Sequence, residues 1–260
     1  MNILNTIVDH TRRDLAVARR MLPQERLEQH AREMPAPPDF AAALRDRGGQ
    51  ANIIAELKRA SPSAGEIRPD FGVMSLAREL EAAGAAALSV LTEVRFFRGS
   101  PTYLRAVSAN ASIPVLRKDF IVDEYQVLKA LTLGASAVLL IAAVLPVEQL
   151  HHLDETARAL GMQTLVEVHN QDELDELLAC FRPEVIGINC RDLKTFATDL
   201  EVTARLLRGI PDSCVKVAES GIRTAADVAA MRKEGADAFL VGETLMRAQR
   251  PGKALEELLS

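Results

Sequence analysis

Hydrophobic residues in this 260-residue chain fall into short apolar runs that alternate with amphipathic stretches, from residue 50 to the C-terminus. Eight of the runs predict β-strands, and most are continuously apolar, as is typical of parallel strands buried on both faces. The predicted strands span 52–56, 87–92, 113–117, 137–141, 163–168, 185–189, 215–219 and 238–241. The amphipathic stretches that follow them predict helices at 74–83, 102–109, 124–133, 146–160, 171–180, 200–208, 225–234 and 251–259.

A repeated sequence unit links successive elements. The segments AAGAAALSV, TLGASAVLL and KEGADAFLV each contain a helix end, a glycine–alanine turn and the start of the next strand. Gly84, Gly134, Gly161 and Gly235 are predicted helix stops, where glycine readily adopts the left-handed conformation. The chain therefore repeats one βα unit, which indicates an α/β fold with a parallel sheet.

Eight βα units can form either a closed barrel or an open, doubly wound sheet. Polar and charged residues follow nearly every predicted strand, and a barrel keeps its chemistry at the C-terminal ends of its strands. An open sheet would concentrate such residues at one switch point, and no GxGxxG segment follows the first strand. We therefore predict a (β/α)8 TIM barrel with extra N-terminal helices. A single domain spans residues 1–260 in this interpretation, with an N-terminal helical extension at 1–48 and the barrel at 50–260.

The N-terminal extension has a pattern of its own. Residues 3–21 carry apolar side chains at helical spacing among charges, which predicts a helix. Prolines between residues 35 and 38 then break the chain before a short predicted helix at 40–47. We expect this extension to cap or flank the barrel.

Composition and charge narrow the class of protein. A net charge of -5 argues against a general nucleic-acid binder. The charged first stretch contains no apolar signal core, and the longest apolar run, 135–145, is too short to span a bilayer. Cys180, Cys190 and Cys214 lie far apart without zinc spacing, which favours reduced thiols. We expect a cytoplasmic protein without a metal site, and the sequence leaves its oligomeric state open, a monomer included.

Ionisable side chains gather at the predicted strand ends. In chain order these ends carry Glu56, Lys58, Thr92, Glu93, Lys118, Glu167, Asn189, Arg191 and Glu219. If the barrel closes, the two lysines and three of the glutamates, Glu56, Glu167 and Glu219, converge on one mouth, where buried acid–base pairs shift one another's pKa values. For any one of them a structural ion pair or a solvated loop charge is the alternative. For the whole set at the same end of successive strands, catalysis is the better interpretation.

The last two βα turns predict a phosphate site. Ser220 and Gly221 follow the seventh strand and run straight into a helix, and Gly242 and Glu243 follow the eighth. Small residues at these turns let backbone N–H groups face a phosphate, with a helix N-terminus adding a favourable dipole. Glu243 carries a negative charge, so we expect its side chain to point away while its backbone N–H binds.

The loop after the first strand is the most specific feature. In the segment AELKRASPSAGEI, Glu56 and Lys58 share one face by strand alternation, and Ser61 starts a rigid, hydroxyl-bearing loop that can close over a ligand. ELKRASPS resembles the signature of indole-3-glycerol-phosphate synthases. Further blocks agree in order: SVLTEVRFFRGS, IPVLRKDFIVDEYQV, LVEVH, GINCRDL, VAESGI and LVGETLMRA. The resemblance runs from about residue 53 to residue 246.

The resemblance implies an enzyme that converts 1-(2-carboxyphenylamino)-1-deoxyribulose 5-phosphate into indole-3-glycerol phosphate with release of CO2 and water. By this resemblance Lys118 is the general acid, Lys58 contacts the substrate carboxylate, and Glu167 assists the final dehydration. Glu56, Asn189 and Glu219 match residues that orient the lysines and the ribulose hydroxyls. The matched substrate contacts are Ser61, Arg191, Ser220, Gly221, Gly242 and Glu243, with Phe97, Phe120 and Leu139 around the anthranilate ring. The implied partner is a phosphorylated small molecule, with no metal, cofactor, nucleic acid or membrane.

Two departures and three rival functions stay open. Cys190 stands where the family more often has Asn, and the helix at 74–83 lacks an aromatic residue that is frequent there. The nearest rival is a sugar-phosphate isomerase on the same barrel, such as phosphoribosylanthranilate isomerase. A Schiff-base aldolase would use Lys118 or Lys58 as nucleophile. A non-catalytic barrel would bind the phosphorylated ligand without turning it over.

Overall fold

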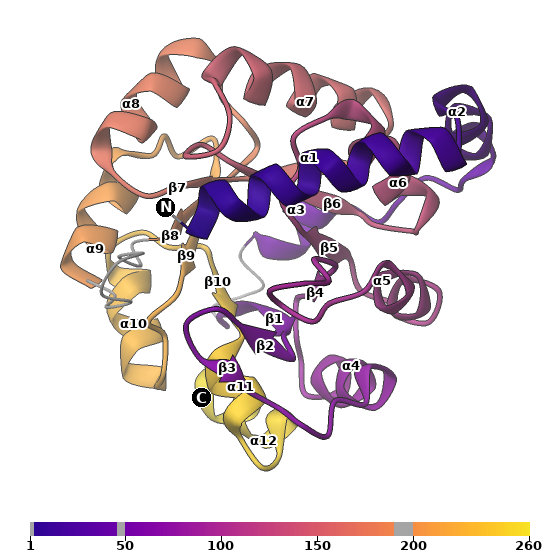
Figure 1. Ribbon diagram of the computed structural model, residues 1–260. Coiled ribbons are helices and arrows are strands. Elements are labelled where there is room, and N and C mark those ends of the chain that lie inside the picture. The colour runs from indigo at the N-terminus through magenta and orange to yellow at the C-terminus, as the bar shows by residue number, and fades with distance from the viewer. Residues whose placement is uncertain (1–2, 46–49, 190–199) are drawn as a thin grey trace.

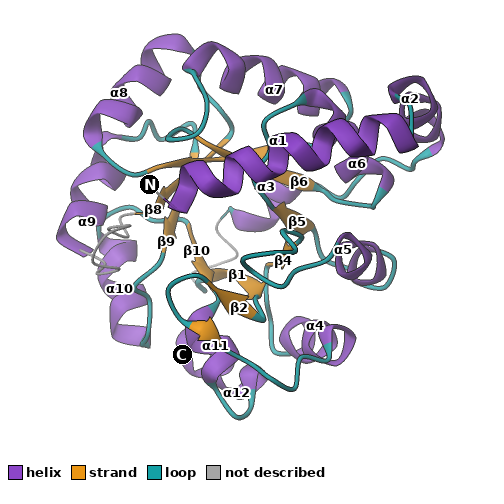
Figure 2. Cartoon of the chain, in the orientation of Figure 1, coloured by secondary structure: helices purple, strands orange, loops and turns teal. Residues whose placement is uncertain are grey.

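Eight parallel strands close into a barrel in the computed structural model, which describes residues 3–45, 50–189 and 200–260 (Figures 1 and 2). The barrel strands are β1 (Asn52–Leu57), β4 (Ala87–Leu91), β5 (Val115–Lys118), β6 (Ala137–Ile141), β7 (Gln163–Val168), β8 (Val185–Asn189), β9 (Val215–Glu219) and β10 (Ala238–Val241). Each strand pairs with its neighbour in sequence order, and β1 closes the barrel by pairing with β10 as well as β4. The predicted TIM barrel is confirmed.

Helices surround these strands, one after each (Figure 1). They are α4 (Val73–Ala82), α5 (Pro101–Ser108), α6 (Glu124–Thr132), α7 (Val147–Ala159), α8 (Gln171–Cys180), α9 (Leu200–Gly209), α10 (Ala225–Lys233) and α12 (Pro251–Leu259). A short helix, α11 (Glu243–Arg247), lies between β10 and α12. The four glycines predicted as helix stops all have positive φ, between 74° and 98°, so they terminate helices as expected.

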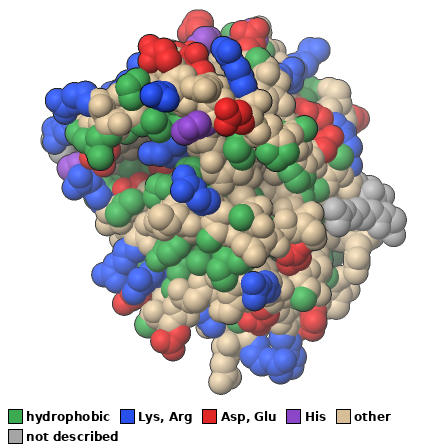
Figure 3. All heavy atoms as spheres, turned by 90° about the vertical axis from the view of Figure 1, so that its right-hand side faces the viewer, with side chains coloured by type: hydrophobic (Ala, Val, Ile, Leu, Met, Phe, Trp, Pro, Cys, Tyr) green, Lys and Arg blue, Asp and Glu red, His purple; other side chains and the backbone are tan. Residues whose placement is uncertain are grey.

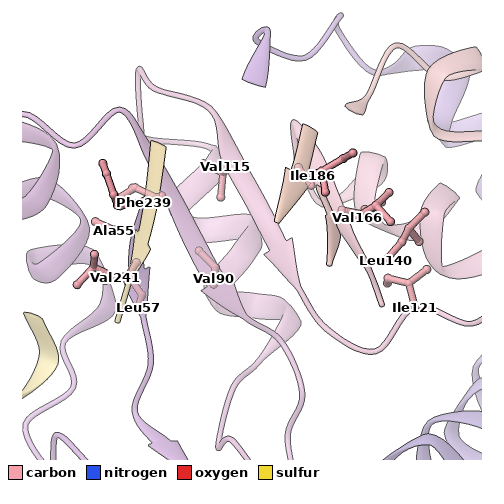
Figure 4. Close-up of a cluster of buried hydrophobic side chains, with 14 of the residues drawn as sticks. Ala55, Leu57, Val90, Val115, Ile121, Leu140, Val166, Ile186, Phe239 and Val241 are labelled. Carbon is pink, nitrogen blue, oxygen red and sulfur yellow. The ribbon is translucent and has the colours of Figure 1, made fainter. Parts of the chain in front are cut away.

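Side chains on the strands alternate between the barrel interior and the surrounding helices. Figure 4 shows buried side chains such as Val90, Val166 and Ile186, which belong to the large apolar cluster that the helices also contribute to. Strand residues such as Leu116 and Leu165 belong to a second cluster, which fills the barrel itself. This alternation places the polar residues at the C-terminal ends of the strands above a dry interior.

The N-terminal end of the barrel is closed by α3 (Phe40–Leu44). Phe40 is fully buried and belongs to the interior cluster. Its backbone N–H donates to Gln163 Oε1 at 2.6 Å, and Asn52 Nδ2 donates to the carbonyl of Leu44 at 2.8 Å. The short helix is therefore tied to the bases of β7 and β1.

The opposite end is crossed by α1 (Ile3–Met21), the indigo helix that lies over the strands in Figure 1. Its C-terminal half is anchored to α6, where the Tyr125 hydroxyl lies 3.1 Å from the carbonyl oxygen of Ala18 and 2.9 Å from that of Leu22. Its first residues reach the cavity at the barrel mouth. The helix predicted at 3–21 therefore forms and covers part of this opening.

Local structure departs from the sequence-based predictions in five places. Residues Gln24–Glu33 form a helix, α2, that was not predicted, because among its ten residues only two apolar ones, Leu27 and Ala31, are buried. Strand β5 begins at residue 115 instead of 113, since Pro114 has no N–H to donate to a neighbouring strand. The loop after β1 contains a two-stranded hairpin, β2 (Ala60–Ser61) and β3 (Gly65–Glu66). The predicted helix at 40–47 ends at Leu44, and residues 46–47 lie outside the described part.

The fifth departure concerns α10, which does not begin directly after Gly221. Thr224 is its N-cap, and the Thr224 hydroxyl accepts from the Asp227 N–H at 3.2 Å in a capping box. Ser220 and Gly221 instead lie in the loop with positive φ values of 63° and 78°. The expectation that they run straight into a helix was wrong, because a strong N-cap four residues on sets where this helix starts.

The outer surface mixes charges of both signs. On the face shown in Figure 3, acidic, basic and apolar side chains are interspersed. Among the described residues, no helix has both the length and the apolar character needed to cross a membrane.

Candidate active site

The C-terminal mouth of the barrel holds a cavity of about 740 Å³, within the range of pockets that bind small molecules. Its walls come from the ends of the strands, from the β2–β3 hairpin and from the first turns of α1. Fourteen of the predicted site residues are among its described lining: Glu56, Lys58, Ser61, Phe97, Lys118, Phe120, Leu139, Glu167, Asn189, Glu219, Ser220, Gly221, Gly242 and Glu243. The predicted mouth therefore assembles from all eight βα units.

Lys118 lies at the centre of the charged groups. It is the last residue of β5, and its ammonium lies 2.9 Å from Glu167 Oε2 on β7 and 3.5 Å from Glu219 Oε2 on β9. Only 13% of the Lys118 side chain is exposed, and the two carboxylates are exposed by 5% and 2%. An ammonium buried between two carboxylates and facing a cavity can donate a proton to a bound ligand.

Lys58 and Glu56 form a second ion pair beside the first. Lys58 Nζ lies 2.6 Å from Glu56 Oε1, and the lysine stands just beyond the end of β1. Glu56 is buried at 3% exposure, whereas Lys58 is 14% exposed at the edge of the cavity. Together these five residues, Glu56, Lys58, Lys118, Glu167 and Glu219, are called the acid–base cluster below.

Electrostatics divide the cluster into groups with different protonation. Burial alone would lower the pKa of Lys118, but Glu167, Glu219 and Glu56 outweigh it and raise that pKa, so the lysine is an ammonium at neutral pH. Burial works to raise the pKa of Glu167, but Lys118 and His169 outweigh it and hold that pKa well below the usual value.

Glu219 behaves in the opposite way. Burial, with smaller contributions from Glu167 and Glu56, raises the pKa of Glu219 to about 8 in spite of Lys118. Its Oε1 is buried without a hydrogen-bond partner among the described atoms. The pKa values of Glu167 and Glu219, the two carboxyl groups next to Lys118, therefore differ in opposite directions from the usual value. Such a difference lets one carboxyl group accept a proton while the other carries one.

Two glycines make room for the carboxylates. A Cβ atom on Gly187 in β8 would lie 2.2 Å from Glu219 Oε1, and one on Gly242 would lie 2.4 Å from Glu56 Oε1. Both glycines face the barrel interior at the layer of the cluster. Gly187 and Gly242 therefore leave the space that the buried carboxylates of Glu219 and Glu56 occupy.

Apolar side chains form one wall of the cavity. The rings of Phe97 and Phe120 lie 6.0 Å apart between centroids, and Leu139 from β6 belongs to the same lining. Glu93 shapes the Phe97 loop, because its Oε2 accepts from the backbone N–H groups of Phe96 and Phe97 at 2.7 and 2.9 Å. Glu93 was expected at the mouth with the other strand-end charges, but its carboxylate is used to hold this loop.

Thr92 was also expected at the mouth, and it too has a structural role. Its hydroxyl donates to Asp119 Oδ2 and accepts from Arg117 Nε at 3.1 Å. Arg117 Nη1 donates to the carbonyl of Gln126 at 2.8 Å, so this buried network joins β5 to α6. It lies on the helix side of β5, because alternation turns Arg117 away from the face that carries Lys118.

The opposite wall contains the small residues of the last two turns. Ser220 Oγ donates to Asn189 Oδ1 at 2.8 Å, and the consecutive positive φ values of Ser220 and Gly221 turn the backbone at the cavity edge. Glu243 Oε1 accepts from Arg247 Nε at 2.9 Å, so the Glu243 side chain is held along α11. Ser61, on the β2–β3 hairpin that follows β1, accepts from the Ala64 N–H at 3.1 Å.

Several cavity residues were not foreseen, and two predicted features lie outside the described part of the chain. Ile3, Leu4 and Ile7 of α1 line the cavity, as does His169. His169 follows Glu167 by two positions, so strand alternation was a signal that could have placed it on the same face. Arg191 and Cys190 belong to the undescribed segment.

Metal ligation finds no support in this cluster. Across residues 3–45, 50–189 and 200–260, no three or more His, Cys, Asp or Glu side chains are grouped so that they could hold a metal ion.

Sequence comparisons point to one family. A family model described as indole-3-glycerol phosphate synthase matches residues 4–258. The indole-3-glycerol phosphate synthase of Dechloromonas aromatica (strain RCB) is 48% identical over 261 aligned positions, covering 100% of this chain and 99% of that protein. The indole-3-glycerol phosphate synthase of Rhodopirellula baltica is 48% identical over 247 positions, which cover 95% of each chain.

Solved structures share the barrel at much lower identity. The 3-hexulose-6-phosphate synthase of Salmonella typhimurium superposes with a TM-score of 0.65 at 14% identity, covering 80% of this chain and 96% of the other. A mutant tryptophan synthase alpha-subunit of Pyrococcus furiosus superposes with a TM-score of 0.61 at 17% identity, covering 81% of this chain and 98% of the other. At such identities the likeness concerns the fold alone.

Proposed function

This chain belongs to the indole-3-glycerol phosphate synthase family, and we propose that its acid–base cluster carries out the three steps of that reaction. The enzyme is a carboxy-lyase of tryptophan biosynthesis. It takes a phosphorylated small molecule, 1-(2-carboxyphenylamino)-1-deoxyribulose 5-phosphate, through ring closure, decarboxylation and dehydration to indole-3-glycerol phosphate. The location of Lys118 at 2.9 Å from Glu167 and 3.5 Å from Glu219, facing the cavity, is the observation that carries the proposal.

Ring closure begins when the ring carbon that bears the carboxylate attacks the C2′ carbonyl. The carbonyl oxygen gains negative charge as the carbon–carbon bond forms, and Lys118 donates a proton to it. The ammonium is suited to this role because the surrounding carboxylates raise the pKa of Lys118 and keep it protonated until substrate binds. General acids of this kind contribute about 10²- to 10⁴-fold in rate.

Decarboxylation follows from the product of the first step. The attack leaves the ring nitrogen in an iminium-like form, and loss of CO2 returns an electron pair that restores the aromatic ring. Lys58 contacts the substrate carboxylate before this loss, and Glu56 holds the Lys58 ammonium at 2.6 Å. The nitrogen of the substrate is the electron sink in this step, so the proposed mechanism uses lysine and glutamate side chains without a metal or cofactor.

Dehydration completes the indole. The C2′ hydroxyl leaves as water with a proton from a lysine ammonium, and the adjacent C1′ carbon loses a proton. Glu167 accepts that proton, a role supported by a pKa that Lys118 and His169 hold low enough to keep the carboxylate ionised. Asn189 and Glu219 orient the ribulose hydroxyls beside it.

Substrate binding divides between the two walls of the cavity. Phe97, Phe120 and Leu139 enclose the anthranilate ring. The phosphate lies at the opposite wall, where Ser220, Gly221, Gly242 and Glu243 offer backbone N–H groups and Ser61 closes over it from the hairpin; Arg191 is a further proposed contact. The positive φ values at 220 and 221 support this, since such a turn directs successive N–H groups to one side.

The remaining assignments concern the whole chain. We propose that it works as a single domain, in which residues 1–48 cap the barrel and the first turns of α1 complete the apolar wall. A monomer suffices, because the acid–base cluster and the described cavity lining come from one chain. A cytoplasmic location is supported by the free thiols of Cys180 and Cys214.

Fluorescence of the indole product tests the function. The purified protein should form product from the carboxyphenylamino-deoxyribulose phosphate, and Lys118→Ala should lower kcat by about 10³-fold because the general acid is lost. Lys253→Ala is the matched control, since that lysine is 62% exposed on α12 and should leave kcat unchanged. No product from the intact protein would refute the function, and a loss below tenfold in Lys118→Ala would refute the role of this lysine.

Borohydride reduction separates this proposal from a Schiff-base aldolase. An ammonium held between carboxylates is a poor nucleophile, so no covalent adduct with Lys118 should be trapped in the presence of substrate. A trapped adduct at Lys118 or Lys58 would favour the aldolase.

A further inference from the structure

His169 connects the acid–base cluster to a surrounding helix. It stands just after β7 and lines the cavity two positions beyond Glu167, on the same face of the strand. Its Nε2 lies 3.1 Å from Glu167 Oε1, whereas Lys118 Nζ lies 2.9 Å from the other oxygen, Oε2. Each oxygen of the Glu167 carboxylate therefore has its own nitrogen partner, and the carboxylate plane is held from two sides.

The imidazole is itself held from the outside. His169 Nδ1 lies 3.1 Å from Glu173 Oε2, and the same oxygen accepts from the His169 backbone N–H at 2.8 Å. Glu173 belongs to the first turn of α8, where its Oε1 accepts from Asn170 Nδ2 at 2.7 Å and its backbone N–H donates to Asn170 Oδ1 at 3.0 Å. The capping residues of α8 thus fix Glu173, which fixes His169, which holds Glu167.

We infer that His169 is a positioning residue for Glu167: it holds the Glu167 carboxylate, through the Glu173 carboxylate of α8, in the orientation needed for proton transfer. The inference rests on the function proposed above, in which Glu167 accepts a proton during dehydration. Without such contacts, a glutamate side chain in a cavity can rotate about two χ angles and about the bond to its carboxylate. A misplacement of a reacting group by about 1 Å can lower a rate by about 10²-fold. The chain of contacts from α8 removes that freedom before substrate arrives.

The charge of His169 adds an effect that titration can detect. Burial would lower the pKa of His169, but hydrogen bonds to Glu167 and Glu173 raise it to about 10, so the ring is an imidazolium at neutral pH. Among the other charged groups, Lys118 of β5 and Glu219 of β9 face Glu167, and Glu173 of α8 faces His169. Glu56 of β1 acts one step further away, on Lys118 and Glu219. Removal of the imidazolium leaves Glu167 with one cation fewer and the Glu173 charge unscreened. Both changes raise the pKa of Glu167 and move the acidic limb of the kcat profile to higher pH.

Two substitutions separate orientation from charge. His169→Ala removes both, and it should lower kcat by about 10- to 100-fold while KM changes by less than about threefold, since the effect lies in proton transfer. His169→Gln keeps a side-chain N–H within reach of Glu167 and a similar volume, but no charge. It should recover most of kcat, and in both variants the acidic limb should move up by about one pH unit.

The measurements are kcat, KM and their pH profiles for the parent, His169→Ala and His169→Gln, with melting temperatures as a check on folding. His152→Ala is the matched control, because His152 also faces a glutamate but is 62% exposed on α7, and it should leave all three quantities unchanged. A kcat within threefold of the parent in His169→Ala, a loss confined to KM, or a His169→Gln variant no better than His169→Ala would overturn the inference. An active parent with unchanged His169 variants would refute this inference alone, whereas an inactive parent would refute the proposed function and the inference with it.

Discussion

Gly187 lies in β8 at a point where a side chain has no room. A Cβ atom there would lie 2.2 Å from Glu219 Oε1 and 3.1 Å from Leu165 Cδ1. Glu219 is 1% exposed, and its other carboxylate oxygen, Oε2, lies 3.5 Å from the ammonium of Lys118. Gly187→Ala therefore adds one methyl group directly against a residue of the acid–base cluster, at a position that is not among the cavity-lining residues.

The size of the effect follows from the distances. Cβ atoms essentially never lie closer than 3.0 Å to another heavy atom, so Oε1 must retreat by about 0.8 Å or more. The retreat changes the 3.5 Å approach between Glu219 and Lys118. A displacement of about 1 Å in a positioned group lowers a rate by about 10²-fold, and overpacking of one methyl in a core costs about 1–3 kcal/mol. In a domain of this size that corresponds to a fall of roughly 2–12 °C in melting temperature.

Indole fluorescence with purified Gly187→Ala, alongside thermal unfolding, measures both effects. Gly209→Ala is the control, because that glycine ends α9 and an added Cβ atom would lie 3.3 Å from its nearest neighbour, Leu174 Cδ2, the end of a flexible side chain. We expect the control to keep kcat within twofold of the parent and to melt within about 2 °C of it. A Gly187→Ala protein that retained kcat within threefold would show that Glu219 can move by this distance without consequence, and the argument from position would be refuted.

Two further predictions concern Glu219 and the N-terminal extension. The pKa of Glu219 is raised to about 8, so its contribution to stability is complete below about pH 4.5 and is lost as pH rises through about 8. A glutamine at this position does not ionise and suffers no such loss. The melting temperature of Glu219→Gln, compared with that of the parent, should therefore be higher at pH 9 than at pH 6. Parallel melting curves at the two pH values would contradict this. Deletion of residues 1–38 removes Ile3, Leu4 and Ile7 from the cavity wall and should raise KM by about tenfold or more, with a lower melting temperature but a folded barrel. Unchanged KM and melting temperature would show that the extension does not cap the site.

The hydrophobic pattern was sufficient to predict the architecture, because the order of apolar and polar residues within each short segment shows which of its faces is buried. Eight apolar runs of strand length, with glycine stops such as Gly84 and Gly134 between helix and strand, led to the barrel that the structure confirms. The pattern failed to predict a helix where few apolar residues are buried, because the periodic signal is then weak. Helix α2 buries little apolar surface, and its position depends on packing against α6 and on the Gln24 amide, which donates to Glu124 Oε1 at 2.9 Å.

Many of the candidate site residues could likewise be assigned to the barrel mouth from the sequence. The ends of parallel strands meet at one mouth whatever the details of closure, so Lys118, Glu167 and Glu219 could be assigned to it before their distances were known. Glu93 shows the limit of that rule, because a strand-end carboxylate can equally well serve backbone N–H groups of its own loop. The choice depends on the conformation of residues 95–97, for which the sequence carries no periodic signal.

The sequence by itself determined the fold class, the family and the end of the barrel at which the chemistry lies, since alternation and helical periodicity report which faces are buried. Only the tertiary structure decided which charged groups touch. The contacts between Lys118 and Glu167, between His169 and Glu173, and between Gly187 and Glu219 depend on strand stagger and tilt in the closed barrel and on where α8 begins. Those quantities are set by all eight strands together, so no local stretch of sequence contains them.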